Sequence, residues 1–159
     1  MPIAPRLANY LDEHLARYEL CDHAHTETSA QTARSAHVPP QQLAKSVILE
    51  DDRGCVMAVL PADRRVHIGE LARLLGRHEL HLSDEARVKM LFNDCAPGAV
   101  PAFGMAWGME TIVDETLQQA PAVYIEAGDH EQLLKLSRDD FNALMREARH
   151  AHFGHTMPH

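Results

Sequence analysis

The sequence predicts a fold of the α/β (α+β) class built on a mixed sheet, and three observations indicate it. Segments with the apolar spacing of helices alternate with short β-rich runs from Leu7 to Met145. The two most apolar runs, 45–49 and 55–60, flank a turn that ends in glycine, which is typical of a β-hairpin. The chain has 159 residues, 45% of them hydrophobic and 24% charged, as expected for one globular domain.

The N-terminal part is predicted to hold two helices and a short strand. Residues 2–18 have the spacing of an amphipathic helix, with leucines recurring every four positions. Residues 18–21 are typical of a short strand. The small side chains of 28–36 predict a second helix, with Thr28 as its N-cap because a hydroxyl can accept from the first-turn amides.

The central part is predicted to hold the middle of the sheet. Residues 45–60 are apolar at nearly every strand position, so we expect this hairpin to be covered on both faces. Residues 68–75 predict a short helix stopped by the glycine that follows, and 78–82 an edge strand. Another helix is expected from about 83 to 92, capped by Ser83.

The C-terminal part begins with a bent loop. Residues 94–104 hold two prolines and two glycines, which cannot form regular structure. Ser137 is expected to cap the last helix. Strands are predicted before that helix, at about 110–113, 121–126 and 132–136.

These elements predict a single domain over residues 1–150, whose N-terminal helix is 2–18. From His150 the chain is expected to fray, which leaves a flexible, histidine-containing tail over 151–159.

Composition excludes several classes of protein. Fifteen Lys and Arg against 23 Asp and Glu give a net charge of −8, which argues against a protein that coats nucleic acid. No apolar run approaches the ~20 residues of a membrane helix, and the acidic N-terminus does not resemble an export signal. Three cysteines are too few for a disulfide framework, so the sequence predicts a cytoplasmic protein without a membrane partner.

Common catalytic and metal motifs are missing from the sequence. There is no glycine-rich nucleotide loop and no nucleophile elbow. Alternate residues Cys21, His23 and His25 would share one strand face, and further histidines lie in the tail. Neither group has the spacing of a zinc site, so no metal is expected.

Two features remain that could carry chemistry. Lys45 begins the most apolar strand, where it is either an edge residue that reaches solvent or a fixed cation that orients an anionic or carbonyl group. The loop from Gly98 to Gly104 is either a structural bend or a backbone wall that offers N–H and C=O groups to a ligand.

Taken in order, several stretches resemble the YbaK / prolyl-tRNA synthetase-associated editing domain family over residues 20–145. They are His23-Ala-His-Thr-Glu-Thr, Leu43-Ala-Lys-Ser-Val-Ile-Leu, Ala58-Val-Leu-Pro-Ala-Asp and the loop Asp94-Cys-Ala-Pro-Gly-Ala-Val-Pro-Ala-Phe-Gly. The chain departs from many relatives at Ala102-Phe103, and in having Pro101 three positions after Gly98 rather than four.

The resemblance implies a free-standing trans-editing hydrolase that removes a wrong amino acid from the 3′ adenosine of a tRNA and so protects translation fidelity. It implies a mixed, partly barrel-like sheet surrounded by helices, and no metal or organic cofactor. The implied catalytic residue is Lys45. The implied substrate-binding residues are His25, Thr26, Gly98, Ala99, Val100, Pro101 and Gly104.

The chemistry fits this resemblance. An aminoacyl ester is already activated, so water or a substrate hydroxyl can attack it when a cation and backbone dipoles stabilise the oxyanion. Selection by size favours a small amino acid such as Ala, Ser, Thr or Cys. We expect a monomer whose partner is a tRNA acceptor end, and an aminoacyl-tRNA synthetase is a further candidate.

Three other functions stay open at this stage. One is a non-catalytic tRNA- or ligand-binding module, another a metal-handling protein, and the third a hydrolase that uses Cys95. Basic side chains form either a tRNA-docking face or an ordinary solvated surface; they are Arg64, Arg65, Arg73, Arg77, Arg87 and Lys89.

Overall fold

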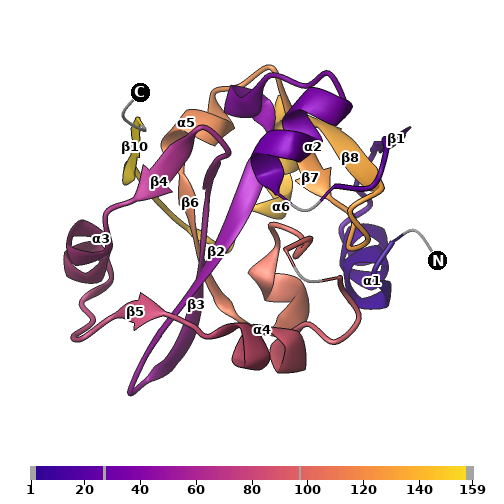
Figure 1. The fold of residues 1–159 in the computed structure, drawn as a ribbon. Coiled ribbons are helices and arrows are strands. Elements are labelled where there is room, and N and C mark those ends of the chain that lie inside the picture. Colours follow the sequence, from indigo (N-terminus) through magenta and orange to yellow (C-terminus); the bar gives the residue numbers. More distant parts are fainter. Residues whose placement is uncertain (1–2, 27, 97, 157–159) are drawn as a thin grey trace.

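A computed structural model describes residues 3–26, 28–96 and 98–156, and its mixed sheets and helices confirm the predicted class (Figure 1). The α-helices of the described part are α1 (Pro5–Glu13), α2 (Ser29–Ser35), α3 (Ile68–Leu75), α4 (Glu85–Leu91), α5 (Glu115–Gln118) and α6 (Arg138–Leu144). Its strands are β1 (Glu19–Asp22), β2 (Ala44–Asp51), β3 (Gly54–Pro61), β4 (Arg64–Val66), β5 (His81–Leu82), β6 (Glu110–Asp114), β7 (Ala122–Glu126), β8 (Gln132–Ser137), β9 (Arg149–Ala151) and β10 (Gly154–Thr156). Two short 3-10 helices are η1 (Pro40–Gln42) and η2 (Gly104–Trp107).

A five-stranded sheet in the order β5-β2-β3-β6-β9 forms the centre of the molecule. β2 and β3 are the predicted hairpin, antiparallel with Ala44 opposite Pro61, whereas β3–β6 and β6–β9 are parallel. Met57 and Val59 enter one hydrophobic core and Val56 enters another. The hairpin is therefore buried on both faces, as its apolar sequence predicts.

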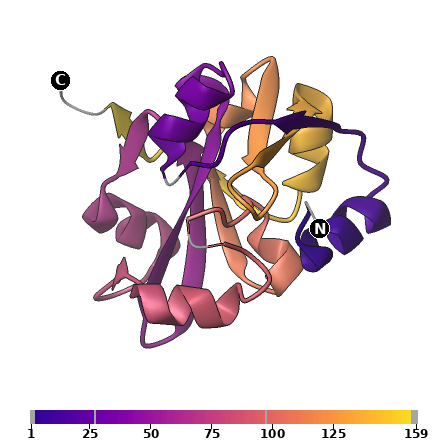
Figure 2. The same ribbon diagram turned by 45° about the vertical axis from the view of Figure 1, so that its right-hand side comes forward.

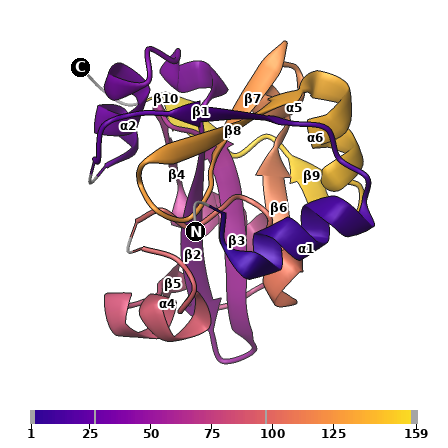
Figure 3. The same cartoon turned by 90° about the vertical axis from the view of Figure 1, so that its right-hand side faces the viewer.

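Helices and a second sheet cover these faces. The larger core lies between the central sheet, α1, α6 and the three-stranded sheet β1-β8-β7; Figure 3 views the molecule from that side. On the opposite face, α3 packs through Leu71 and Leu75. A third cluster joins Ala33 of α2 to Leu43 and Leu133.

The strands do not close into a barrel. Within the described residues, β2 is joined to β7 by one parallel bridge between Leu43 and Tyr124. The helices surround the mixed sheets as expected, but the barrel-like part of the expectation is limited to this contact.

Several helix boundaries follow from local chemistry. The α3 helix has the predicted bounds, and Thr28 accepts from the Gln31 amide as the N-cap of α2. The α4 helix is capped by Asp84 rather than Ser83, since the Asp84 carboxylate accepts from the Arg87 amide. The α1 helix is shorter than predicted because Leu15 adopts a φ of 53° and is 87% exposed, outside the apolar stripe.

The predicted fraying from His150 is wrong for residues 150–156. β9 pairs with β6, and β10 pairs with β4. Phe153 between them is fully buried, and the Asp114 carboxylate accepts from the amides of Phe153 and Gly154. Residues 157–159 of the predicted tail, and Pro2 of the predicted first helix, lie outside the described residues.

No helix in the described ranges has both the length and the apolar character needed to cross a membrane.

Candidate functional site

Lys45 and the surface half of the predicted loop lie at one edge of β2. Its other edge is paired with β3 along the whole strand. At this edge, the described residues pair with β2 only at Leu43, which meets β7, and at 49–50, which meet β5. Residues 44–47 therefore leave a gap in the ladder, where backbone groups can bind a ligand. Figure 2 shows α2 and α4 at opposite ends of β2, on either side of this stretch.

Lys45 lies in this gap. Its side chain is half-buried, and in the described part of the chain its ammonium makes no hydrogen bond or ion pair. Burial lowers the pKa of Lys45, and the Asp63 carboxylate in the turn after β3 partly offsets this. A half-buried cation whose ammonium forms no hydrogen bond or ion pair with the described residues is a suitable binding group for an anion or a polarised carbonyl.

The loop after α4 reaches the same edge from the other face of β2. The Ser46 hydroxyl donates to the Val100 carbonyl over 3.0 Å. Since successive strand residues point to opposite faces, Lys45 lies on the face opposite Ser46. The lysine and the loop are therefore neighbours at the open edge, although their side chains approach it from different sides.

The loop itself divides into two halves. Gly98, with a φ of 80°, and the half-buried Val100 lie at the surface. Ala99 and Pro101 have buried side chains. Gly104 is packed in the core, because a Cβ added there would meet Thr111, Met57 and the Met109 carbonyl. Only the first half of the predicted wall is placed to meet a ligand.

His25 and Thr26 lie beside the turn between β7 and β8. The His25 ring stands edge-on to the His130 ring, with 5.7 Å between centroids. The Thr26 and Thr32 hydroxyls share a hydrogen bond of 2.6 Å, which ties this segment to α2. The same turn contacts the loop, since the Ala96 amide donates to the Gly128 carbonyl.

Two buried residues in this region were not identified from the sequence. His130 is 2% exposed, and Glu126 at the end of β7 is 5% exposed. Burial raises the pKa of Glu126 to about 7; a hydrogen bond to Thr32 opposes this shift and the nearby Asp129 adds to it. Leu43 and Tyr124 form a parallel bridge. Lys45 lies two residues after Leu43, and Glu126 lies two residues after Tyr124, so both side chains point to the same face as the bridged pair. The sequence signal that could have identified Glu126 is an acidic residue at the end of an otherwise apolar predicted strand.

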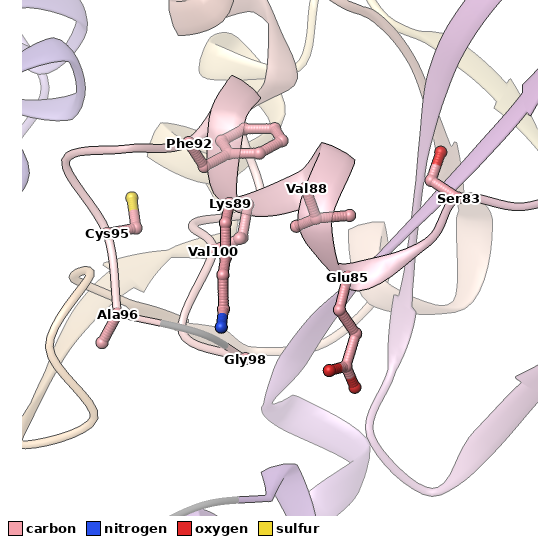
Figure 4. Close-up of a pocket in the computed structure, with 9 residues that line it drawn as sticks. All are labelled: Ser83, Glu85, Val88, Lys89, Phe92, Cys95, Ala96, Gly98 and Val100. Atoms are coloured by element: carbon pink, nitrogen blue, oxygen red, sulfur yellow. The ribbon is translucent and has the colours of Figure 1, made fainter.

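A cavity of about 440 Å³ opens between α4 and the loop (Figure 4). It adjoins the open edge, because the Ser83 amide donates to the Ile48 carbonyl and Val100 is held by Ser46. The lining residues are Ser83, Glu85, Val88, Lys89, Phe92, Cys95, Ala96, Gly98 and Val100.

The alternative functions gain little from the structure. Burial, together with Asp94, raises the pKa of Cys95 to about 12, so a thiolate nucleophile is disfavoured at neutral pH. In the described ranges, no three His, Cys, Asp or Glu side chains are grouped to hold a metal ion. The His155 imidazole bonds Glu70 over 2.8 Å instead.

The predicted basic face is not continuous. Arg77 is buried and bonded to Asp51 and Glu110 over 2.8 and 2.9 Å, so it serves the packing of the sheet. Arg87 is paired with Glu50 over 3.1 Å.

Comparison with known proteins adds independent evidence. A crystal structure described as that of a candidate trans-editing enzyme for prolyl tRNA synthetase superposes with a TM-score of 0.83, at 22% identity over 98% of each chain. The hypothetical protein APE2540 gives 0.82 at 22% identity, over 94% of this chain and 99% of its own. These two likenesses show a shared fold.

At the level of sequence, proline–tRNA ligase of Lactobacillus helveticus (strain DPC 4571) is 25% identical over 103 residues, which is 65% of this chain. The chain spans only 18% of the length of that ligase. A family model described as the aminoacyl-tRNA editing domain matches residues 23–144. Because that match covers well over half of the chain, this protein belongs to the aminoacyl-tRNA editing domain family.

Proposed function

We propose that this protein is a trans-editing deacylase that hydrolyses the ester between a small, wrongly attached amino acid and the 3′ adenosine of a tRNA. The observation that carries the proposal is Lys45, a half-buried cation at an open strand edge whose ammonium forms no hydrogen bond or ion pair with the described residues. Family membership supports the same reaction class.

Lys45 is the proposed catalytic residue. Its ammonium would hold the terminal phosphate or the aminoacyl carbonyl, where positive charge stabilises the oxyanion that forms during attack. Backbone groups of the open β2 edge and of Gly98–Val100 would surround the ester. The nucleophile would be water or a ribose hydroxyl, because a bound ester needs orientation more than a strong base.

The proposed partner is the acceptor end of tRNA alone. A net charge of −8 opposes an extended phosphate contact. Few phosphates need to be neutralised when only the terminal nucleotides are bound. The amino acids that fit selection by size are alanine, serine, threonine and cysteine.

Single-turnover deacylation of Ala-, Ser-, Thr- and Cys-charged tRNA tests this proposal. We expect wild type to clear at least one substrate and Lys45→Ala to slow that reaction by about 100-fold or more. Lys135→Ala is the matched control, because Lys135 is also a half-buried strand lysine but lies on β8 against Tyr124. Its rate should stay within about threefold of wild type.

Two results would contradict the proposal. Near-wild-type hydrolysis by Lys45→Ala would show that Lys45 is not the catalytic residue. Hydrolysis of none of the four substrates at micromolar protein would favour a non-catalytic binding module.

A further inference from the structure

The cavity between α4 and the loop is larger than the proposed reaction requires. Its volume of about 440 Å³ is in the range of sites that hold whole small molecules. A small amino acid side chain would fill only a fraction of this space. The cavity is therefore suited to another part of the bound molecule.

The cavity continues directly from the open edge of β2. Ile48, bonded to Ser83 at the cavity wall, follows Lys45 by three strand residues, about 10 Å along β2. Val100, which lines the cavity, is bonded to Ser46, the neighbour of Lys45. Lys45 points to the face of β2 opposite Ser46, Ile48 and the cavity, so a chain whose end is held at Lys45 would cross the open strand edge and place its preceding unit beside α4.

The side chains at the cavity combine one acceptor, one donor and apolar walls. Glu85 and Lys89 are four residues apart on α4, and Figure 4 shows both extending along the same side of the helix. Both are exposed, and no other described side chain pairs with either within 4.0 Å. Val88 and Val100 supply half-buried apolar surface beside them.

This pattern complements the pairing edge of cytosine. Cytosine presents an amino donor beside ring acceptors, and a carboxylate is the side chain that accepts from that amino group. Single-stranded RNA bases are commonly recognised at this edge, with apolar or aromatic groups against their faces. Uracil presents the opposite pattern, with a carbonyl where cytosine has its amino group.

We propose that this cavity binds the cytosine nucleotide that precedes the terminal adenosine of tRNA. Glu85 accepts from the base amino group, and Lys89 donates to the ring acceptors. The proposal rests on the proposed function, since it takes the tRNA end as the ligand and Lys45 as the position of the terminal adenosine.

The test compares RNA hairpins that end in CCA with otherwise identical hairpins that end in CUA, chemically acylated with the amino acid that wild type removes fastest. We expect wild type to hydrolyse the CCA form about tenfold faster. Glu85→Ala and Lys89→Ala should each reduce this ratio to within about twofold, because each removes one of the two base contacts. Lys135→Ala, the matched lysine control, should keep the full ratio.

Binding of the same uncharged hairpins, measured by fluorescence anisotropy, separates this proposal from the proposed function. Preference for CCA without hydrolysis would uphold the cavity and overturn the deacylase. If the protein hydrolyses or binds the CCA and CUA hairpins equally well, the proposal that the cavity binds cytosine is overturned. A ratio that persists in Glu85→Ala and Lys89→Ala would overturn it as well.

Discussion

Substituting Gly104 by alanine tests whether the second half of the loop is structural. A Cβ at this position would lie well inside contact distance of the Thr111 hydroxyl oxygen, and 3.3 Å from both the Met57 Cβ and the Met109 carbonyl. All three neighbours belong to the packed interior. Thr111 is 3% exposed and its hydroxyl donates to Met109, so it cannot turn away freely.

The expected cost follows from this crowding. An added methyl group in a packed core costs about 1–3 kcal/mol of the free energy of unfolding. For a chain of 159 residues, each kcal/mol lowers the melting temperature by about 2–4 °C. Gly104→Ala should therefore melt about 2–12 °C below wild type, as measured by circular dichroism with urea unfolding alongside.

Two further variants make the test specific. Thr111→Ala removes the hydroxyl that the new methyl group would meet, so Gly104→Ala/Thr111→Ala should be more stable than the two single costs predict, by about 1 kcal/mol. Gly69→Ala is the matched control, because a Cβ there meets nothing closer than 3.6 Å in α3; it should be neutral or gain up to about 1 kcal/mol. Gly104→Ala within about 0.5 kcal/mol of wild type, or strict additivity in the double variant, would refute this reasoning.

Two other stability measurements examine the C-terminal segment and the buried acid. Phe153→Ala should lower the free energy of unfolding, measured in urea, by about 3–5 kcal/mol, since the ring is fully buried against α3. A cost below about 1 kcal/mol would indicate that the C-terminal segment is frayed after all. The pKa of Glu126 rises from 4.5 to about 7 on folding, so the folded state holds its proton more tightly and stability falls as pH rises through that interval. The fall should approach about 3 kcal/mol between pH 4.5 and pH 8 in urea titrations. Glu126→Gln should lose most of this dependence, and an unchanged slope would contradict the assignment.

Elements whose causes are local could be predicted well from the sequence. The α3 helix matches its predicted bounds because Gly76 adopts a φ of 65° and ends it. The central hairpin is recognisable because nearly every residue in it is apolar. By contrast, the polar strand β10 has no strand signal of its own and depends on Asp114, forty residues earlier in the chain.

The candidate site shows the same limit. Lys45 stands out because it is a charge at the head of an apolar strand. Its position on the face opposite Ser46 depends on the strand pairing, and the cavity exists only because α4 packs beside the loop. The sequence does not distinguish Gly98 from Gly104, although Gly98 lies at the surface and Gly104 in the core.

The pairing of β1 with β8 has a consequence for how the chain folds as it is synthesised. Leu20 is opposite Leu134, so β1 has no strand partner until β8 has been made. The β2–β3 hairpin can form at once, but β9 joins β6 only after residues 149–151 have left the ribosome. Such distant contacts slow folding and leave strand edges exposed in the meantime. A nascent chain of this protein should therefore gain protease resistance late, in one step, after β9 has emerged.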